Sequence, residues 1–288
     1  MKAWLLAARP KTLSAAVVPV LVGSALAAHE PPAVSWWVFF CALAGSVLIQ
    51  VATNLINDAM DFKKGADTGE RLGPVRVTQA GLITPQRVLQ MAWVCLILAA
   101  LFGVPLLIRG GWPMLLVGVA SIAAAYAYTG GPYPLAYHGL GELFVILFFG
   151  FIAVGGTFYV HSLQLTRSAL LAGFATGALA AVLIVINNLR DVAGDRTSNK
   201  RTLAVRFGET FARAEVAFFG LVPFAAIVWL AWMRTQWGLL MPLLALPLAL
   251  LVVLRVQRSR GAELNRCLAI AGGLQWAFGI LFVLGSLV

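Results

Sequence analysis

Residues 54–67 read NLINDAMDFKKGAD and close a long apolar run from Trp36 to Ile56. The stretch holds three aspartates and two lysines, in a chain with only 11 acidic residues among 288. A second acidic stretch, NNLRDVAGDRTSNK at 187–200, also ends an apolar run. Carboxylates at the edge of a membrane are costly unless they are paired, solvated or metal-bound. The two stretches therefore predict one functional site built from two parts of the chain.

The composition is that of a polytopic membrane protein. Apolar residues make up 61% of the chain and charged residues 11%, against about 45–50% and about 25% in soluble domains. A helix needs roughly 20 mostly apolar residues to cross a bilayer. The nine expected spans are 12–29, 35–57, 87–108, 112–129, 141–161, 167–187, 211–232, 236–254 and 267–287. We expect an all-α integral membrane protein of nine transmembrane helices, forming one domain over residues 1–288.

Basic residues lie almost wholly on one side of the expected spans. With the N-terminus in the cytoplasm, 18 of the 21 Lys and Arg residues fall in cytoplasmic segments, and the exceptions are Arg109, Arg167 and Arg234. This asymmetry satisfies the positive-inside rule. It predicts a protein of the cytoplasmic (inner) membrane, with the N-terminus and both acidic stretches in the cytoplasm and the C-terminus external. Since much of the net charge of +10 is then a topology signal, we expect no nucleic-acid binding.

The chain also shows a weak internal repeat, with halves at roughly 1–135 and 136–288. Each half has an apolar helix, an Asn-rich end, paired acids and a basic loop. Internal repeats in membrane proteins place equivalent helix ends around one cavity. We therefore expect the two acidic stretches to face each other.

The spacing of the acidic stretches suits a metal–diphosphate site. Two sets of side chains would each share one helix face: Asn54, Asp58 and Asp61, and Asn187, Asp191 and Asp195. Mg²⁺ takes only one or two protein carboxylates and fills its shell with water and substrate phosphate. The nearby bases that would bind phosphate oxygens are Lys63, Lys64, Arg190, Lys200 and Arg201. For either stretch alone, an ordinary charged loop is the simpler interpretation.

A diphosphate at the membrane edge, with an apolar cavity behind it, indicates a prenyl diphosphate donor. Departure of the diphosphate leaves an allylic cation, which a metal ion assists and aromatic faces stabilise. The aromatic candidates for that role are Tyr126, Tyr128, Tyr133, Tyr137, Phe144, Phe148, Phe149 and Tyr159. For any single one of them, plain packing is the simpler explanation.

At these motifs the chain resembles the UbiA-type membrane prenyltransferases. The two acidic stretches are similar to that family's two signatures, and ARPKTLSAAVVPVLVG near the start and YTGGPYPLAYHGLGELFVILFFG at 128–150 are similar to its other segments. The resemblance implies nine transmembrane helices around a central cavity, Mg²⁺ dependence, and transfer of a polyprenyl group from polyprenyl diphosphate. Within the family, the ARPKTL and GGPYPLAYHGLGE segments most resemble the branch that prenylates 1,4-dihydroxy-2-naphthoate, with decarboxylation, to give demethylmenaquinone.

The resemblance also implies roles for residues matched by position. The aspartates that would be catalytic and hold the metal are Asp58, Asp61, Asp191 and Asp195. The matched residues that would bind substrate are Asn54, Asn57, Asp67, Asn188, Arg190 and Lys200. To these we add Lys63, Tyr128 and Glu142 from their own positions in the sequence. The family's commoner first motif, NxxxDxxxD, is altered here, because Phe62 stands at its second aspartate and Asp61 comes one residue earlier.

The acceptor side leaves alternatives open. Glu142 would orient an acceptor hydroxyl, act as a base, or simply favour the helix dipole. Arg9 and Lys11 would meet an acceptor carboxylate or only set topology. The small residues of GFIAVGG at 150–156 would widen an apolar slot for a bicyclic acceptor or serve close helix packing.

Other acceptors and another class of protein are the remaining alternatives. The same chemistry would act on 4-hydroxybenzoate, homogentisate, haem or a glycerol-phosphate lipid. A membrane transporter with acidic ion sites is the alternative of another class, although transport would favour acids near the bilayer midplane. A CDP-alcohol phosphotransferase would need a DGxxAR continuation, which is absent after Asp61.

Overall fold

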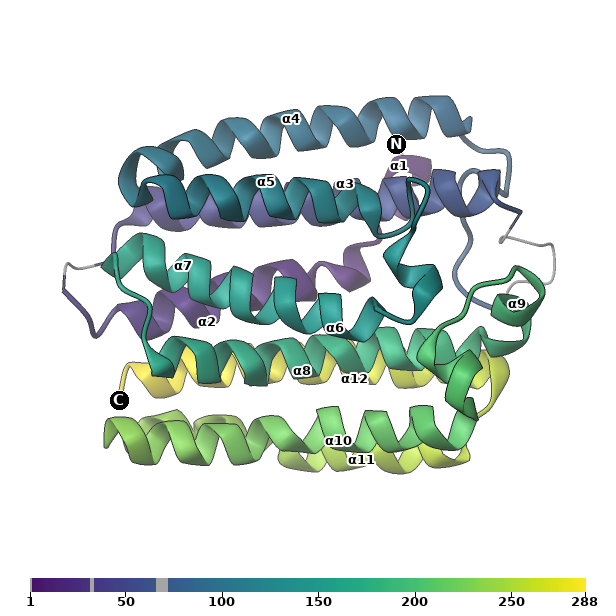
Figure 1. The fold of residues 1–288 in the computed structure, drawn as a ribbon. Helices are drawn as coiled ribbons and strands as arrows, with labels where there is room; N and C mark the ends of the chain where they lie inside the picture. Colours follow the sequence, from purple (N-terminus) through teal and green to yellow (C-terminus); the bar gives the residue numbers. More distant parts are fainter. Residues whose placement is uncertain (1, 32–33, 66–71) are drawn as a thin grey trace.

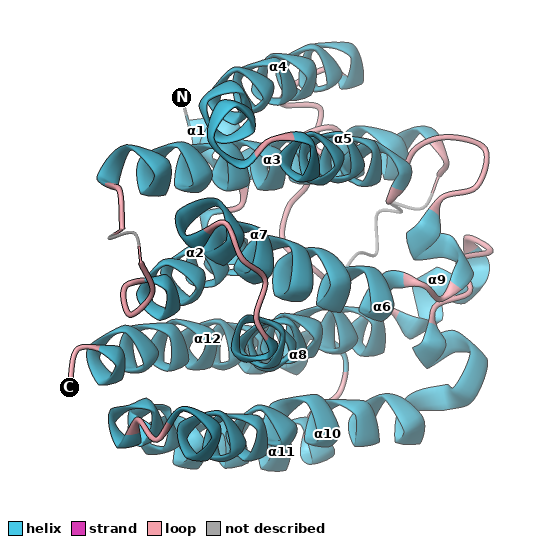
Figure 2. Ribbon diagram, turned by 60° about the vertical axis from the view of Figure 1, so that its left-hand side comes forward, coloured by secondary structure: helices cyan, strands magenta, loops and turns pink. Residues whose placement is uncertain are grey.

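The computed structural model describes residues 2–31, 34–65 and 72–288. Over these three ranges the chain is helical and contains no strand (Figure 2). The long helices run side by side and turn back at the two ends of the bundle (Figure 1). The short helix α9 (Val192–Thr197) lies at one end, and the C-terminus lies at the other.

The elements follow one another in chain order. The first part comprises α1 (Lys2–Ala8), η1 (Pro10–Thr12), α2 (Ser14–Ala27), α3 (Trp36–Lys63), α4 (Pro85–Gly110) and α5 (Trp112–Ala127). The middle comprises η2 (Leu135–His138), α6 (Gly141–Val145), the π-helical η3 (Ile146–Ile152), α7 (Ala153–Ser162) and α8 (Arg167–Arg190). After α9 come α10 (Leu203–Arg234), η4 (Trp237–Ala245), α11 (Leu246–Arg258), η5 (Gly261–Glu263) and α12 (Leu264–Ser286).

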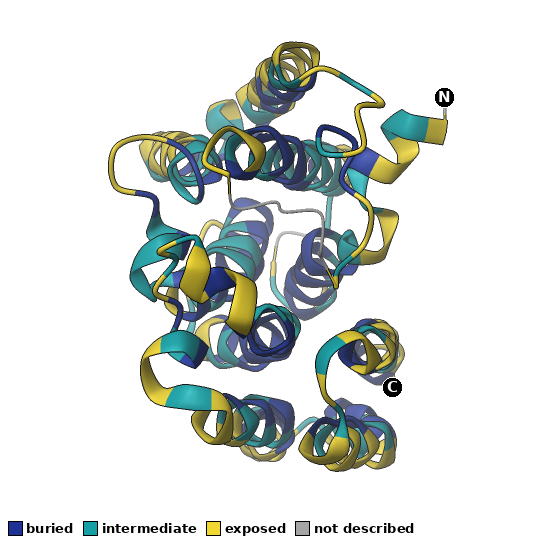
Figure 3. Cartoon of the chain, turned by 90° about the vertical axis from the view of Figure 1, so that its right-hand side faces the viewer, coloured by how far each residue is buried: buried dark blue, intermediate teal, exposed yellow. Residues whose placement is uncertain are grey.

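Helix α8 lies at the centre of the bundle. In its most apolar window 72% of the residues are buried, against 28% for α4 at the edge. It packs against α10, α12, α2 and η3. The largest hydrophobic cluster joins α8 to α2, α7, α10 and α12 through side chains such as Phe158, Phe278 and Phe282. Buried residues face inward around α8, and exposed residues line the outer helices (Figure 3). The second acidic stretch therefore lies at the end of the most buried of the candidate membrane spans.

The spans occupy the predicted places, but the count of nine is not confirmed. In the described part of the chain seven helices are long and apolar enough to cross a membrane, or eight if the pair Lys2–Thr12 and Ser14–Ala27, bent by 50°, is one span. The break between the two members lies at Leu13, and Arg9, at the start of η1, has a left-handed φ of 51°. Helix α5 occupies the predicted position 112–129 but has only 16 helical residues.

The ends of two spans differ from the expectation. Helix α3 does not stop at residue 57 but continues to Lys63, so that Asp58 and Asp61 lie in its last turns rather than in a loop. Helix α8 likewise runs on to Arg190, and Asp195 lies within α9. Helix α3 extends because Asp58 and Asp61 find partners on the α3–α4 link and η2, as described below, and this tertiary stabilisation outweighs the cost of burying charge.

Glycines hold η3 directly against α8. A Cβ on Gly177 would lie 2.9 Å from the Cα of Gly150 and 2.9 Å from the carbonyl oxygen of Ile146. A Cβ on Gly150 would lie 2.5 Å from the Gly173 carbonyl oxygen. Of the two roles considered for the small residues at 150–156, Gly150 serves close packing. Gly156 instead lines the central cavity, where a Cβ would meet only Val117, at 3.7 Å.

We predict that Gly177→Ala destabilises the bundle, because the new methyl group meets backbone atoms that cannot move aside. Overpacking of this kind costs about 1–3 kcal/mol, which a lower midpoint of thermal unfolding in detergent would report. The matched control is Gly103→Ala in α4, where nothing lies within 4 Å of the added Cβ. Because alanine is the better helix former, this control should be neutral or stabilising. Equal midpoints for the two variants would contradict the assigned contact.

Candidate active site

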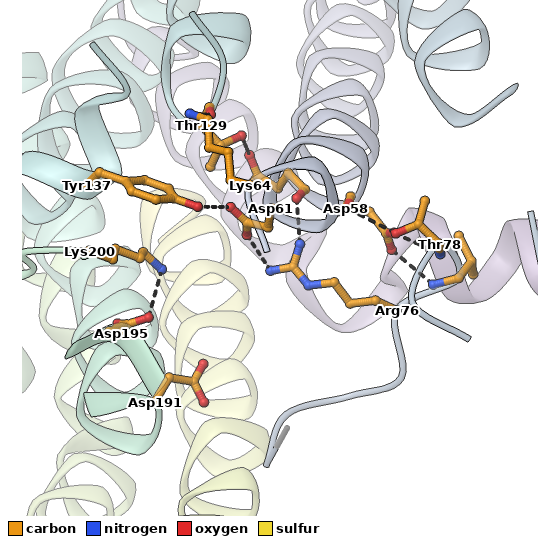
Figure 4. A network of polar contacts seen from close by, with 12 residues as sticks. Asp58, Asp61, Lys64, Arg76, Thr78, Thr129, Tyr137, Asp191, Asp195 and Lys200 are labelled. Carbon is orange, nitrogen blue, oxygen red and sulfur yellow. Dashed lines mark hydrogen bonds and ion pairs between the residues drawn. The ribbon is translucent and has the colours of Figure 1, made fainter. Parts of the chain in front are cut away.

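The carboxylate of Asp61 is the meeting point of three segments. The side chain is 4% exposed. One oxygen receives the Arg76 guanidinium at 2.7 Å, and the other receives the hydroxyl of Tyr137 at 2.9 Å. Arg76 comes from the α3–α4 link and also donates to the Asn57 carbonyl at 2.6 Å. Asp61 therefore ties the end of α3 to its own following loop and to η2 (Figure 4).

Asp58 lies about one turn before Asp61 on α3, and its carboxylate is bound by backbone groups. It is 1% exposed, and its oxygens accept the N–H groups of Val77 and Thr78, each at 3.1 Å. The Thr78 hydroxyl donates to the same carboxylate. In Figure 4 this side chain points toward Thr78 and away from Tyr137. The immediate role of Asp58 in this arrangement is to fold the α3–α4 link onto the helix end.

The second acidic stretch presents two aspartates with different partners. Asp195 is 6% exposed and lies 3.4 Å from the ammonium of Lys200. Asp191 is more exposed and pairs through both oxygens with Arg190, at 2.8 and 2.6 Å. Burial raises the pKa of the Asp195 carboxyl to about 6, although the Lys200 ammonium lowers it. Its Oδ2 atom is buried and has no hydrogen-bond partner among the described residues.

Tyr137 joins the two acidic stretches. Its hydroxyl donates to Asp61, and its carbonyl accepts the N–H of Arg201 at 2.9 Å. The ammonium groups of Lys64 and Lys200 lie 4.8 and 5.8 Å from the centre of its ring. Two cations from opposite halves of the chain thus converge on one aromatic ring. The expected meeting of the two stretches in space is observed in the fold.

An apolar cavity opens beneath this cluster. It has a volume of about 490 Å³ and runs between α2, α3, α5, α7 and α8. The polar residues at its mouth include Asn54, Asn57, Tyr128 and Asn187, which lie in the last turns of their helices or just beyond them. On α3 the lining extends from Asn57 back to Ala42, a depth of about 22 Å at 1.5 Å per residue. Asp61 lies one turn beyond the mouth.

The structure places the remaining predicted residues as follows. Lys63 is exposed, while its neighbour Lys64 donates to the Thr129 carbonyl at 2.7 Å. Glu142 is 3% exposed and accepts the amide of Asn188 at 2.8 Å. Asn188 therefore faces Glu142, and the adjacent Asn187 is the asparagine that lines the cavity. Asp67 lies outside the described residues.

Tyr128 and Asn57 shape the polar mouth of the cavity. The side chain of Asn57 accepts the Thr129 hydroxyl at 2.7 Å, which positions the segment after α5. Tyr128 lies just beyond the end of α5 and lines the cavity.

Oxygen donors at this end of the bundle suit a hard cation such as Mg²⁺. No three His, Cys, Asp or Glu side chains converge as a ready metal site within the described ranges. Mg²⁺ needs only one or two carboxylates when water and phosphate complete its shell. The unsatisfied oxygen of Asp195, buried near Asp61 and Asp191, is a donor of the required kind. The residues present therefore fit a metal held jointly with a phosphate ligand.

Sequence reasoning did not single out Arg76, Thr78 or Thr129. In the sequence Arg76 is only one of several bases in a segment expected to be cytoplasmic, and nothing in its spacing links it to Asp61. Tyr137 was one of eight aromatic candidates for cation stabilisation, but its hydroxyl is bound to a carboxylate outside the cavity. These contacts depend on how the loops fold back, which helix periodicity does not report.

Comparisons with known proteins agree with this geometry. The sequence profile of the UbiA prenyltransferase family matches residues 16–284. A 1,4-dihydroxy-2-naphthoate octaprenyltransferase of Mycobacterium tuberculosis is 39% identical, covering 96% of this chain and 98% of its own. The protein of the same name from Escherichia coli is 36% identical, covering 99% and 94%.

Solved structures share the fold at low sequence identity. A UbiA homolog from Archaeoglobus fulgidus bound to GPP and Mg²⁺ superimposes with a TM-score of 0.66 at 16% identity, covering 99% of this chain and 100% of its own. The apo structure of a UbiA homolog from Aeropyrum pernix gives 0.69 at 14% identity, covering 94% and 96%.

We predict that Asp58→Asn lowers the unfolding midpoint, because the new amide group faces the Val77 N–H and leaves a buried donor without an acceptor. The cost of such a buried group is about 1–3 kcal/mol, measured by thermal unfolding in detergent. Thr78→Val is the matched control, since it removes the hydroxyl and keeps both backbone contacts. An Asp58→Asn protein with unchanged stability and no activity would instead assign Asp58 to the chemistry.

Proposed function

The chain belongs to the UbiA prenyltransferase family, and from this premise we propose that it transfers a polyprenyl group from polyprenyl diphosphate to 1,4-dihydroxy-2-naphthoate. The acceptor loses its carboxylate, and the product is demethylmenaquinone. The observation that carries the proposal is the joining of two acidic stretches through Tyr137 above an apolar cavity, in a chain 39% identical to an octaprenyltransferase of that acceptor.

The diphosphate would bind outside the mouth of the cavity, between the two acidic stretches. Lys64 and Lys200 flank Tyr137 and would contact phosphate oxygens. Asp61, Asp191 and Asp195 would hold Mg²⁺ together with the diphosphate; the metal, when bound, neutralises charge on the leaving group. Arg76 keeps the Asp61 carboxylate in place. Asp67 and Arg190 stay in the proposed site by motif position alone, and Lys63 by its place in the first acidic stretch.

The prenyl chain would extend from the mouth into the cavity. Its apolar walls exclude water from the allylic cation that forms when the C–O bond to the diphosphate breaks. Tyr128 lines the cavity near the mouth, and Phe144 and Phe148 stack at 5.8 Å along its wall. Aromatic faces at this position would stabilise the cation until the acceptor ring attacks it.

The acceptor would enter beside Arg9, Asn54 and Tyr128. Arg9 lines the cavity at the bend between α1 and η1, so its guanidinium would pair with the acceptor's carboxylate. Gly156 leaves room on the α7 wall for a second ring. Glu142 does not line the cavity and is bonded to Asn188, and we place it behind Tyr128 as a supporting residue. Membership of the family removes the argument for a transporter.

We predict that purified protein with Mg²⁺ and a labelled polyprenyl diphosphate prenylates 1,4-dihydroxy-2-naphthoate with the highest kcat/KM among competing acceptors. 4-Hydroxybenzoate and homogentisate are the competitors, because both are electron-rich monocyclic rings. Chelation of Mg²⁺ should abolish turnover, and re-addition should restore it. If a monocyclic acceptor wins, the assignment of the acceptor is wrong while prenyl transfer stands; no transfer to any aromatic ring would reject both.

We propose that the N-terminus and both acidic stretches face the cytoplasm and that the C-terminus is external. The C-terminus lies at the end of the bundle opposite α9, and the basic residues gather at the end that carries α9. Reporter fusions after Arg71 and after Val288 should therefore give opposite signals for cytoplasmic and external location. The same signal from both fusions would rule out this orientation.

A further inference from the structure

Arginines at the end of the bundle that carries the acidic stretches include two sets with different surroundings. In the first, the guanidinium bonds inside the protein: Arg76 to Asp61, Arg190 to Asp191 and Asn265, Arg206 to the carbonyls of Arg201 and His138, and Arg213 to the carbonyls of Val256 and Ser259. In the second, Arg255, Arg258 and Arg266 gather at the α11–α12 link. Across residues 2–31, 34–65 and 72–288, these three guanidinium groups have neither an ion pair nor a hydrogen bond.

The three arginines converge on one pocket. It lies between the end of α11 and the start of α12, and its lining is Leu251, Leu254, Arg255, Arg258, Ser259, Glu263, Arg266 and Cys267. Residues 251, 254, 255 and 258 share one face of α11. Along that face two leucines, 38% and 59% exposed, precede the two arginines toward the helix end.

The walls of this pocket are held by contacts that do not involve the three arginines. Arg213 of α10 donates to the carbonyl oxygens of Val256 and, at 3.0 Å, Ser259, and so satisfies carbonyl groups at the end of α11. The thiol of Cys267 on α12 lies 3.6 Å from the Ser259 hydroxyl. Glu263 accepts the backbone N–H of Arg260 at 3.3 Å. The arginines are therefore free to bind a ligand without cost to the fold.

The order of groups along α11 matches a phospholipid at the membrane surface. Three arginines and Glu263 give the pocket a net charge of +2, and exposed leucines continue from it toward the bilayer. The positive-inside rule accounts for arginines anywhere in this segment, but it does not require them to converge. The link is exposed at the end of the bundle seen in Figure 3.

We propose that this pocket binds the phosphate headgroup of an anionic phospholipid, with its acyl chains along Leu251 and Leu254. Guanidinium groups bind phosphate oxygens through two parallel hydrogen bonds, and basic pockets between membrane helices on the cytoplasmic side suit anionic headgroups. The site is separate from the acidic cluster around Asp61 and needs no prenyl substrate. Its occupation would fix the α11–α12 link at the membrane surface.

The test uses the full-length protein, delipidated in detergent and titrated with phosphatidylglycerol or phosphatidylcholine. Native mass spectrometry counts bound lipids, and the unfolding midpoint reports their effect. Wild type should bind phosphatidylglycerol, with a rise in midpoint, and should not respond to phosphatidylcholine. Arg258→Gln/Arg266→Gln should bind about 25-fold more weakly, from roughly fivefold per arginine near an anionic headgroup.

The matched control is Arg87→Gln/Arg196→Gln, which removes the same charge from exposed positions outside the pocket. It should bind phosphatidylglycerol as wild type does. Equal loss in both double variants would show diffuse surface attraction and overturn the site, as would no loss in either. Inorganic phosphate and glycerol phosphate form the third arm. If these anions raise the midpoint as far as the lipid does, the pocket serves a free phosphate and the lipid assignment fails.

Discussion

The end of the bundle that carries the two acidic stretches depends on the buried carboxylate of Asp61. A charge that is 4% exposed is stable only when its partners are fixed. Arg76 and Tyr137 supply that pairing from two different loops, so the requirement to satisfy one carboxylate positions both loops. Lys200 then reaches the same ring from the second acidic stretch. The resulting cluster is held by hydrogen bonds and ion pairs, although much of it is built from connecting segments.

The cavity beneath the site depends on glycines used in two opposite ways. Lipid tails are as apolar as helix side chains, so membrane helices associate largely through close packing of small residues. Gly150 and Gly177 make that contact between η3 and α8. On the far side of the cavity Gly103 and Gly118 have nothing within 4 Å, which keeps the space open. The wall at η3 and α8 is therefore tightly packed, whereas the glycines on α4 and α5 leave space on the other wall.

Basic residues in this protein carry more than a topology signal. Arg190 joins α8 to α12 through Asn265, and Arg213 binds carbonyl groups at the end of α11. Each of these guanidinium groups satisfies backbone or side-chain oxygens at a helix end, where orphan carbonyls would otherwise need water. The guanidinium groups of Arg255, Arg258 and Arg266 bind no such oxygen within the described part of the chain. Arginine side chains thus stabilise the fold at some positions and form the proposed lipid site at others. The neighbouring residues determine which of the two roles each arginine has.

The sequence by itself determined the class of protein, the approximate spans, the pairing of two acidic stretches and the family. Long apolar runs and sparse acids are local properties, and each is readable from consecutive residues. Tertiary structure decided which partners each aspartate binds. Asp58 and Asp61 share a face on a helical wheel, yet one binds the backbone of Val77 and Thr78 while the other meets Arg76 and Tyr137. Likewise Asn187 lines the cavity and Asn188 faces Glu142. These assignments depend on loops that return from distant positions, because a side chain's partner is set by what packs against its helix and not by its spacing along it.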